Sequence, residues 1–210
     1  MRRRRKKKQL RPLILFLSCL VVGIFLYCNI INITEEDGSK GVFGHTSRVE
    51  KPSITESLLT PNEYSRPQTS LKKVNGVVIH YVGNPGTSAT ANRNYFNGLA
   101  DSKKTYASSH FIVDLDGTII QCVPLDEIAY ASNSRNEDTI SIEVCHPDKS
   151  GEFTADSYEA LIRLVSWLAD KYNLDKEDII RHYDVTGKKC PLYYVENEDA
   201  WNKLKSDIFK

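Results

Sequence analysis

Residues 181–191, which read RHYDVTGKKCP, place the strictest condition on how this chain folds. They carry His182 and Cys190, and an imidazole together with a thiolate is a ligand pair that suits zinc. A third ligand is needed, and the best candidate is His80, which lies in the distant apolar run VVIHY. Two histidines and one cysteine leave the fourth tetrahedral position open for water, which is typical of catalytic zinc sites. The sequence therefore predicts a fold that brings a strand end against a polar loop, and a hydrolytic zinc enzyme.

The N-terminal region has the pattern of a membrane anchor. Residues 1–12 form a basic tail with eight Lys or Arg and no acidic residue, and residues 13–31 read LILFLSCLVVGIFLYCNII. A helix of this length extends roughly 28 Å, close to the roughly 30 Å hydrocarbon core of a bilayer. We expect a transmembrane helix over residues 13–32. The positive-inside rule then places the basic tail in the cytoplasm and the rest of the chain outside the cell.

A cleaved secretion signal is the competing interpretation, because a basic segment followed by an apolar one fits both. No A-x-A-like cleavage site follows Tyr27, and the apolar run is long for a signal peptide, so an uncleaved anchor is favoured. Lipid attachment at Cys19 or Cys28 is disfavoured, because neither lies in a lipoprotein-type context. Both are more simply explained as small apolar residues in the bilayer.

Composition divides the rest of the chain in two. Residues 33–58 are polar and without periodicity, which predicts a flexible linker, and residues 59–210 have the composition of one globular domain. Residues 71–210 contain 16 basic and 21 acidic residues. An acidic domain binds nucleic acid poorly. We expect a monomer without a nucleic-acid partner.

Strand and helix patterns interleave within this domain. Strands are predicted at residues 74–81, 139–145 and 179–180, and a hairpin is predicted around Asp116-Gly117. Helices are predicted over about residues 90–101, 155–172 and 197–209, with Thr90 and either Thr154 or Asp156 as N-caps of the first two. This order indicates an α/β (α+β) fold with a central mixed β-sheet flanked by helices.

Glu143 is the acidic residue of the predicted strand TISIEVC. Burying an unpaired glutamate is costly, so it either forms a salt bridge or faces a cleft. A carboxylate beside an activated water can take its proton and later deliver it to a leaving amine, which makes Glu143 the candidate general base and acid. Lys188, two residues before Cys190, is the candidate for stabilising the oxyanion that develops on attack.

Each of these residues also has a simpler explanation. A lone histidine at the end of a core strand is more often structural than a ligand, and Lys188 can be a solvated surface lysine. What favours a site is the occurrence of His182, Lys188 and Cys190 in one polar loop, together with an acid on a buried strand. We expect Asp184 to cap the chain locally or to hold a ring nitrogen of His182, and not to be a metal ligand.

Four segments, in order, carry a family resemblance: VVIHYVGNPGTSA, SSHFIVDLDGTIIQCVP, TISIEVC and RHYDVTGKKCP. Over about residues 74–195 the chain resembles the N-acetylmuramoyl-L-alanine amidase domain shared by phage and bacterial cell-wall amidases and by peptidoglycan recognition proteins. The resemblance implies His80, His182 and Cys190 as zinc ligands, Glu143 as the catalytic carboxylate and Lys188 as the polarising lysine. One departure is Ser109, where some members have a catalytic tyrosine, so that the acid role passes to Glu143. His110 is expected to pack beneath the site.

The function implied by this resemblance is zinc-dependent hydrolysis of the amide between N-acetylmuramic acid and L-alanine in peptidoglycan, that is, cell-wall degradation. The alternative is a non-catalytic peptidoglycan-binding module on the same fold, although recognition proteins without activity typically lack the cysteine ligand. A cysteine peptidase is a third reading, but Cys190 precedes a proline in a lysine-rich loop and not the start of a helix. We expect Zn²⁺ as cofactor, peptidoglycan as substrate and the membrane as a partner through the N-terminal helix.

Cys122 and Cys145 lie in predicted strands. Outside the cytoplasm a disulfide between them is an open alternative, if the geometry allows it. Buried free thiols are the default expectation.

Overall fold

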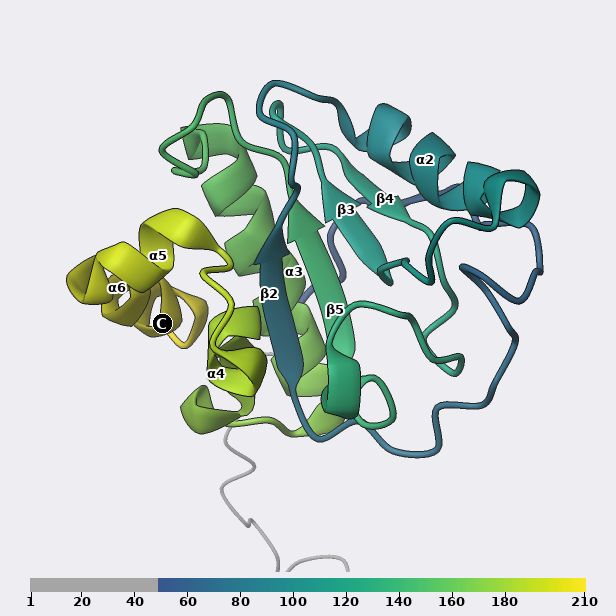
Figure 1. Ribbon diagram of the computed structural model, residues 1–210. Helices are drawn as coiled ribbons and strands as arrows, with labels where there is room; N and C mark the ends of the chain where they lie inside the picture. The colour runs from purple at the N-terminus through teal and green to yellow at the C-terminus, as the bar shows by residue number, and fades with distance from the viewer. Residues whose placement is uncertain (1–48) are drawn as a thin grey trace, which may run out of the picture. The chain divides into compact units, whose positions relative to one another are not determined.

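The computed structural model describes residues 49–210 (Figure 1). The predicted basic tail, the transmembrane helix at residues 13–32 and most of the predicted linker lie outside the described residues. Among residues 49–210, none of the helices combines the length and the apolar character that crossing a bilayer requires. The prediction of a membrane anchor therefore remains a prediction.

Within the described residues, six strands form one mixed sheet in the order β1-β4-β3-β5-β2-β6. Their bounds are β1 (Thr55–Glu56), β2 (Val77–Tyr81), β3 (Phe111–Val113), β4 (Ile119–Gln121), β5 (Ile140–Val144) and β6 (Ile179–Arg181). Only β3 and β4 pair antiparallel, as expected for strands joined by a tight turn, and all other neighbouring strands pair parallel. The predicted mixed sheet is confirmed.

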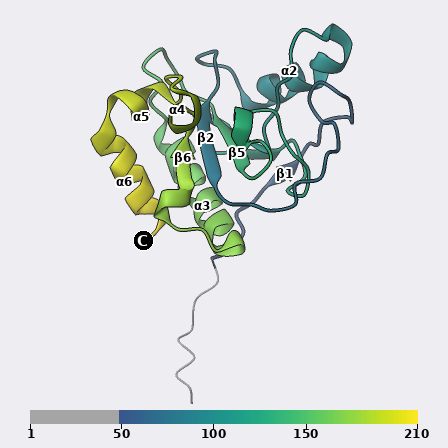
Figure 2. The same ribbon diagram turned by 60° about the horizontal axis from the view of Figure 1, so that its bottom comes forward.

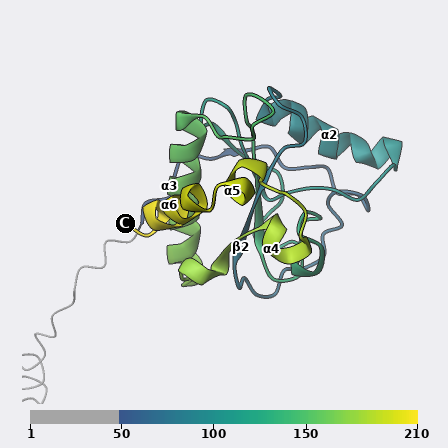
Figure 3. The same cartoon turned by 60° about the vertical axis from the view of Figure 1, so that its left-hand side comes forward.

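The helices cover the two faces of this sheet unequally. The α-helices of the described residues are α2 (Ala89–Ser102), α3 (Ala155–Tyr172), α4 (His182–Thr186), α5 (Leu192–Glu196) and α6 (Glu198–Ile208), and two short 3₁₀ helices are η1 (Asn133–Arg135) and η2 (Lys176–Asp178). In Figure 3, α3 and α6 lie together on one side of the sheet and α2 lies on the other. Figure 2 shows α4 and α5 beside the edge formed by β2 and β6.

The main hydrophobic core lies between the sheet and α3 with α6. Alternate residues of the central strands point into it, because successive side chains of a strand face opposite sides. Strands β2 and β5 contribute five such residues, Val77, Ile79, Ile140, Ile142 and Val144, and each is 0% exposed. Helix α3 faces them with Leu161, Leu164, Val165 and Leu168, which recur at helical spacing.

A smaller core lies under α2 on the opposite face. Phe96 and Leu99 of the helix pack there against Ile112 of β3 and Ile120 of β4. The same face of β2 and β5 carries polar residues in place of apolar ones, notably His80 and Glu143. The apolar residues of α2 cover β3 and β4 and not this polar part of β2 and β5, which leaves room for a site.

The helices begin close to where the sequence placed them. Thr154 caps α3, since its side chain accepts from the N–H of Ser157, and one of the two predicted caps is thus confirmed. Helix α2 begins at Ala89, two residues earlier than a helix capped by Thr90 would begin. Ser88 is its cap and not Thr90, because the Ser88 side chain accepts from Ala91 N.

The domain also begins earlier than the predicted boundary at residue 59. Thr55 and Glu56 form β1, which pairs with β4, and Ser57 N donates to Gln121 O at 3.0 Å. Arg93 of α2 donates to the carbonyl oxygens of Ser57 and Leu58. Residues 55–58 are therefore part of the folded domain, and the prediction that they belong to a flexible linker was wrong. The segment reads TESL and has a single apolar residue, Leu58, so its sequence shows no strand pattern.

Candidate metal centre

The candidate site lies where three adjacent parallel strands end. His80 is the fourth residue of β2, and its register partner on β5 is Glu143, so both side chains lie side by side on one face. His182 follows β6 directly and begins α4. The carboxyl ends of parallel strands are the usual position of sites in α/β proteins. The sheet order β5-β2-β6 thus brings together residues that are far apart in the sequence.

Three side chains converge closely enough to hold one metal ion. The Nδ1 atoms of His80 and His182 are 3.1 Å apart, and Cys190 Sγ lies 3.9 Å from His80 Nδ1. The ligand atoms of the three residues all lie within 4.8 Å of one another, and all three side chains are buried. A tetrahedral zinc ion with its usual bond lengths separates such ligand atoms by roughly 3.3–3.6 Å. The set therefore fits a metal ion of this kind.

The second nitrogen of each histidine ring is held by a residue that sequence reasoning did not single out, Ser132 for His80 and Asn133 for His182. His80 Nε2 lies 3.1 Å from Ser132 Oγ, and His182 Nε2 lies 3.1 Å from Asn133 Oδ1. An amide oxygen only accepts, so His182 donates from Nε2 and keeps the lone pair of Nδ1 free for a metal. Asn136 Oδ1 accepts from the backbone N–H groups of Ala131 and Ser132 and so shapes this loop.

Asp184 does not contact a ring nitrogen of His182, and that part of the prediction was wrong. Its Oδ2 accepts from Arg181 N at 2.8 Å, and its Oδ1 lies 2.9 Å from the Arg181 guanidinium, so the capping alternative is the one observed. Arg181 is buried and also pairs with Glu198 of α6 at 2.8 Å. Its guanidinium lies over the Trp201 ring. Arg181 thereby fixes the start of α4 against the C-terminal helix.

The cysteine is positioned by the turn that follows α4. Gly187 adopts the left-handed conformation, with φ at 77°, and ends the helix. Tyr183 N then donates to Cys190 O at 3.0 Å, which returns the chain to the first turn of α4. The sequence predicted a polar loop here and missed α4, because a five-residue helix has too little periodicity to recognise.

Burial keeps both histidines neutral. It lowers the pKa of His80 well below its ordinary range, and the nearby charges of His182 and Lys188 act in the same direction. The pKa of His182 is lowered as well, first by burial and then by Lys188. A metal ligand must have an unprotonated ring nitrogen, so these shifts favour metal binding near neutral pH.

The Cys190 thiol lacks the surroundings of a catalytic nucleophile. Burial raises its pKa to about 12, and the charge of Glu143 adds to the effect. Nucleophilic cysteines show the opposite shift, produced by a helix N-terminus or adjacent cations. This argues against the cysteine peptidase and agrees with a role as a metal ligand, since ligation to a divalent ion deprotonates a thiol.

Glu143 presents an unsatisfied carboxyl oxygen beside the three ligands. Within the described residues, its Oε2 is buried and has no hydrogen-bond partner. Burial raises the pKa of Glu143 to about 8, although the positive charge of Lys188 opposes the shift. A buried carboxyl group with a free oxygen and a strongly raised pKa is a candidate functional group.

Lys188 lines the same pocket as Glu143. A cavity of about 250 Å³ is bounded by the three ligand residues, Glu143 and Lys188, and Ser108 and Tyr130 also line it. The Lys188 residue is exposed, unlike the ligands. All five residues predicted from the sequence therefore border one cavity, and Lys188 brings the cation.

Ser109 and His110 are both buried away from this cavity. Ser109 Oγ donates to Phe111 O at 2.8 Å, so it does not take the place of a catalytic tyrosine. The His110 ring lies between Ser141 Oγ, at 3.0 Å, and Glu127 O, at 2.9 Å. These contacts agree with the expected packing role. Cys122 and Cys145 are free and buried, which confirms the default expectation for the two thiols.

A sequence profile of the protein family described as "N-acetylmuramoyl-L-alanine amidase" matches residues 70–192. The chain belongs to this family. Residues 70–192 include the three candidate ligands His80, His182 and Cys190, together with Glu143 and Lys188. The family assignment and the cluster of side chains thus refer to the same part of the protein.

Two curated relatives from Bacillus support this assignment. The N-acetylmuramoyl-L-alanine amidase CwlL of Bacillus licheniformis is 34% identical over 168 residues, which covers 74% of this chain and 46% of CwlL. The N-acetylmuramoyl-L-alanine amidase BlyA of Bacillus subtilis (strain 168) is 33% identical over 176 residues, 74% of this chain and 46% of BlyA. The chain thus spans about half the length of the curated relatives it matches.

A solved structure shows the same fold. The structure of PlyL superimposes with a TM-score of 0.64 at 24% sequence identity and covers 75% of this chain and 97% of PlyL. The agreement extends over nearly the whole of that protein. It supports the mixed sheet flanked by helices described above.

Proposed function

We propose that this domain hydrolyses the amide bond between N-acetylmuramic acid and L-alanine in peptidoglycan, with a zinc ion held by His80, His182 and Cys190. One observation carries the proposal. Three converging ligand side chains lie in one cavity with a buried carboxyl oxygen that has no partner, in a chain of the amidase family. This combination is what metal-assisted hydrolysis of an amide requires.

A zinc ion bound here would supply a Lewis acid that polarises the substrate carbonyl and makes a water molecule more acidic. Glu143 takes a proton from the attacking water and passes it to the nitrogen of the leaving L-alanine. The amide C–N bond breaks, the carbonyl carbon gains the hydroxyl, and the nitrogen gains the proton. A carboxyl group with a pKa near 8 can both accept and release a proton near neutral pH.

Lys188 contributes charge and not proton transfer. Its ammonium group borders the cavity that holds the ligands and Glu143. A cation in this position stabilises the negative charge that develops on the carbonyl oxygen during attack.

The test combines metal analysis with identification of the bond that is cut. Purified protein is assayed for zinc and incubated with defined muropeptides, with and without a chelator, and the products are analysed by mass spectrometry. We expect one zinc per chain. The products should carry a free amine on L-alanine and a free carboxyl group on the lactyl moiety, and the chelator should prevent their formation. Cleavage of another bond, or wall binding without hydrolysis, would contradict the proposal, and the second result would support the non-catalytic binding module.

We also propose that residues 13–32 anchor the domain to the cell membrane with the domain on the extracellular side. The support comes from the sequence alone, which has a run of nineteen almost exclusively apolar residues preceded by a strongly basic segment. Membrane fractionation and the mass of the intact protein test this. An intact N-terminus in the membrane fraction is expected, whereas a soluble product that starts after the apolar segment would identify a cleaved signal. Light scattering of the same preparation tests the expected monomer.

A further inference from the structure

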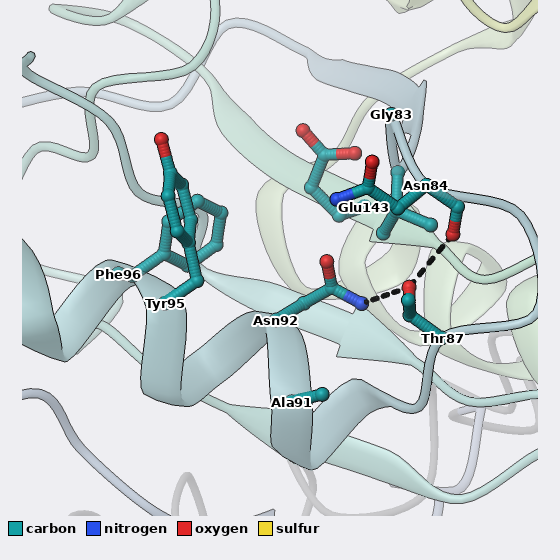
Figure 4. A pocket seen from close by; sticks show the side chains of 9 residues that line it. Gly83, Asn84, Thr87, Ala91, Asn92, Tyr95, Phe96 and Glu143 are labelled. Atoms are coloured by element: carbon teal, nitrogen blue, oxygen red, sulfur yellow. Dashed lines mark hydrogen bonds between the residues drawn. The ribbon is translucent and has the colours of Figure 1, made fainter.

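A second pocket adjoins the candidate metal centre on the α2 side (Figure 4). It has a volume of about 330 Å³ and lies between the loop after β2 and the first half of α2. Three residues, Gly83, Phe96 and Glu143, line both this pocket and the cavity of the metal ligands. The two cavities therefore form one continuous cleft, and Glu143 stands at their junction.

The position of Glu143 divides any substrate of the proposed reaction into two halves. If Glu143 transfers the proton at the scissile amide, then the sugar lies on one side of it and the stem peptide on the other. The cleft offers one compartment for each half. This step rests on the proposed function, and it leaves open only which half occupies which compartment.

The lining of the α2-side pocket is neutral apart from Glu143. Its polar side chains are the amides of Asn84 and Asn92 and the hydroxyl of Thr87, and it contains no lysine or arginine. Asn92 Nδ2 donates to Thr87 Oγ1 at 3.0 Å and to Ser88 O at 2.8 Å. The amide is thereby oriented with its oxygen toward the pocket, as Figure 4 shows. Neutral amides and hydroxyls match the hydroxyl and N-acetyl groups of a sugar.

An exposed aromatic ring forms the opposite side of this pocket. Tyr95 is 57% exposed, whereas its neighbour Phe96 is 8% exposed and packs into the core under α2. Figure 4 shows both rings facing Asn84 and Glu143 across the pocket. A large aromatic side chain exposed beside a polar pocket offers a flat apolar surface. The C–H groups of one face of a pyranose ring pack well on such a surface.

The other compartment suits the peptide better. It contains the cation Lys188, which attracts the carboxylate groups of a stem peptide, whereas the lining of the α2-side pocket contains no cation. From this difference we propose that the pocket lined by Asn84, Asn92, Tyr95 and Phe96 binds the sugar half of the substrate, an N-acetylated glycan. Tyr95 is its stacking surface, and the two asparagine amides are its hydrogen-bonding groups. The peptide half lies on the Lys188 side.

Calorimetric titrations of the zinc-loaded full chain test this assignment with two separate probes. One probe is the neutral tetrasaccharide of N-acetylglucosamine, and the other is the free stem tripeptide L-Ala-D-Glu-L-Lys. We expect Tyr95→Ala to weaken tetrasaccharide binding about tenfold, as removal of a central aromatic contact commonly does, and to change tripeptide binding less than twofold. Tyr95→Phe retains the ring and should bind the tetrasaccharide nearly as the wild type does.

Tyr106→Ala is the matched control, because Tyr106 is 52% exposed and lines neither compartment. It should leave both affinities unchanged. Weaker tripeptide binding by Tyr95→Ala, no change in either affinity, or no measurable tetrasaccharide binding by the wild type would each overturn the inference.

A parallel hydrolysis assay of the wild type separates this inference from the proposed function. Hydrolysis together with Tyr95-independent sugar binding contradicts the pocket assignment alone. Tyr95-dependent sugar binding without hydrolysis contradicts the proposed function alone.

Discussion

The two faces of the central strands differ in what their residues do. On the face covered by α3 and α6, residues such as Ile79 and Ile142 are fully buried in a continuous apolar core. On the opposite face, the adjacent residues His80 and Glu143 border a cavity. The register that pairs Ile79 with Ile142 also pairs His80 with Glu143. A single strand pairing therefore sets both the core and the site, and stability and chemistry are separated by one residue along each strand.

Of the substitutions on the polar face, those of the metal ligands should have the largest effect on hydrolysis. We expect Cys190→Ser to lose both zinc and hydrolysis, because a serine hydroxyl is a far poorer zinc ligand than a thiolate. Zinc analysis of the purified variant and a muropeptide assay measure both. Full zinc content with wild-type turnover would show that the ion, if present, is bound elsewhere.

Neighbouring residues of β5 should show opposite defects. Glu143→Ala should keep zinc and the wild-type thermal stability but lose turnover by about 10²–10⁴-fold, the usual contribution of a general base. Ile142→Ala should cost about 2–5 kcal/mol in the free energy of unfolding, because it opens a cavity in the core, yet retain turnover where it is folded. Denaturant unfolding measures the free energy of unfolding of both variants, and muropeptide assays at one temperature measure their turnover. Retained hydrolysis by Glu143→Ala would refute the catalytic role.

The stability of the domain should depend on pH through His110, a buried histidine. Burial lowers its pKa to about 4, whereas the unfolded chain keeps a pKa near 6.5. Between these values the unfolded state binds more protons, so stability falls as pH decreases from about 6.5 to about 4, by up to roughly 3 kcal/mol.

The variant His110→Asn lacks this titrating group, so its stability should not show this loss between about pH 6.5 and about pH 4. Unfolding of both proteins at several pH values in the presence of a chelator measures the difference, and the chelator removes the contribution of metal binding. Equal slopes for the wild type and the variant would contradict the assignment.

The smallest effect is expected at the loop behind the ligands. Asn133→Ala removes the acceptor that holds His182 Nε2, and the loss of such a partner typically lowers metal affinity 10–100-fold. Competition with a fluorescent zinc chelator measures the affinity. The control is Ser134→Ala, an exposed neighbour in the same short helix. If both variants bound zinc like the wild type, the ring of His182 would not depend on Asn133.

Much of this protein follows from local pattern. Strands β2 and β5 were predicted from continuous β-branched runs, the β3–β4 hairpin from Asp116-Gly117, and α3 and α6 from apolar residues at helical spacing. The three ligands were predicted because few residue types bind zinc, and the acid because a glutamate within a buried strand needs a reason to be there.

The tertiary structure decided what depends on contacts between distant segments. Ser132 and Asn133 lie at the start of the short helix η1 in a segment whose composition marks no function, and they acquire one only because β2 and α4 place two histidine rings against them. Likewise, the burial of Glu143 Oε2 without a hydrogen-bond partner depends on which distant segments pack around the end of β5. Side-chain periodicity records which face of an element is buried, whereas convergence on a site depends on how elements far apart in the chain pack together.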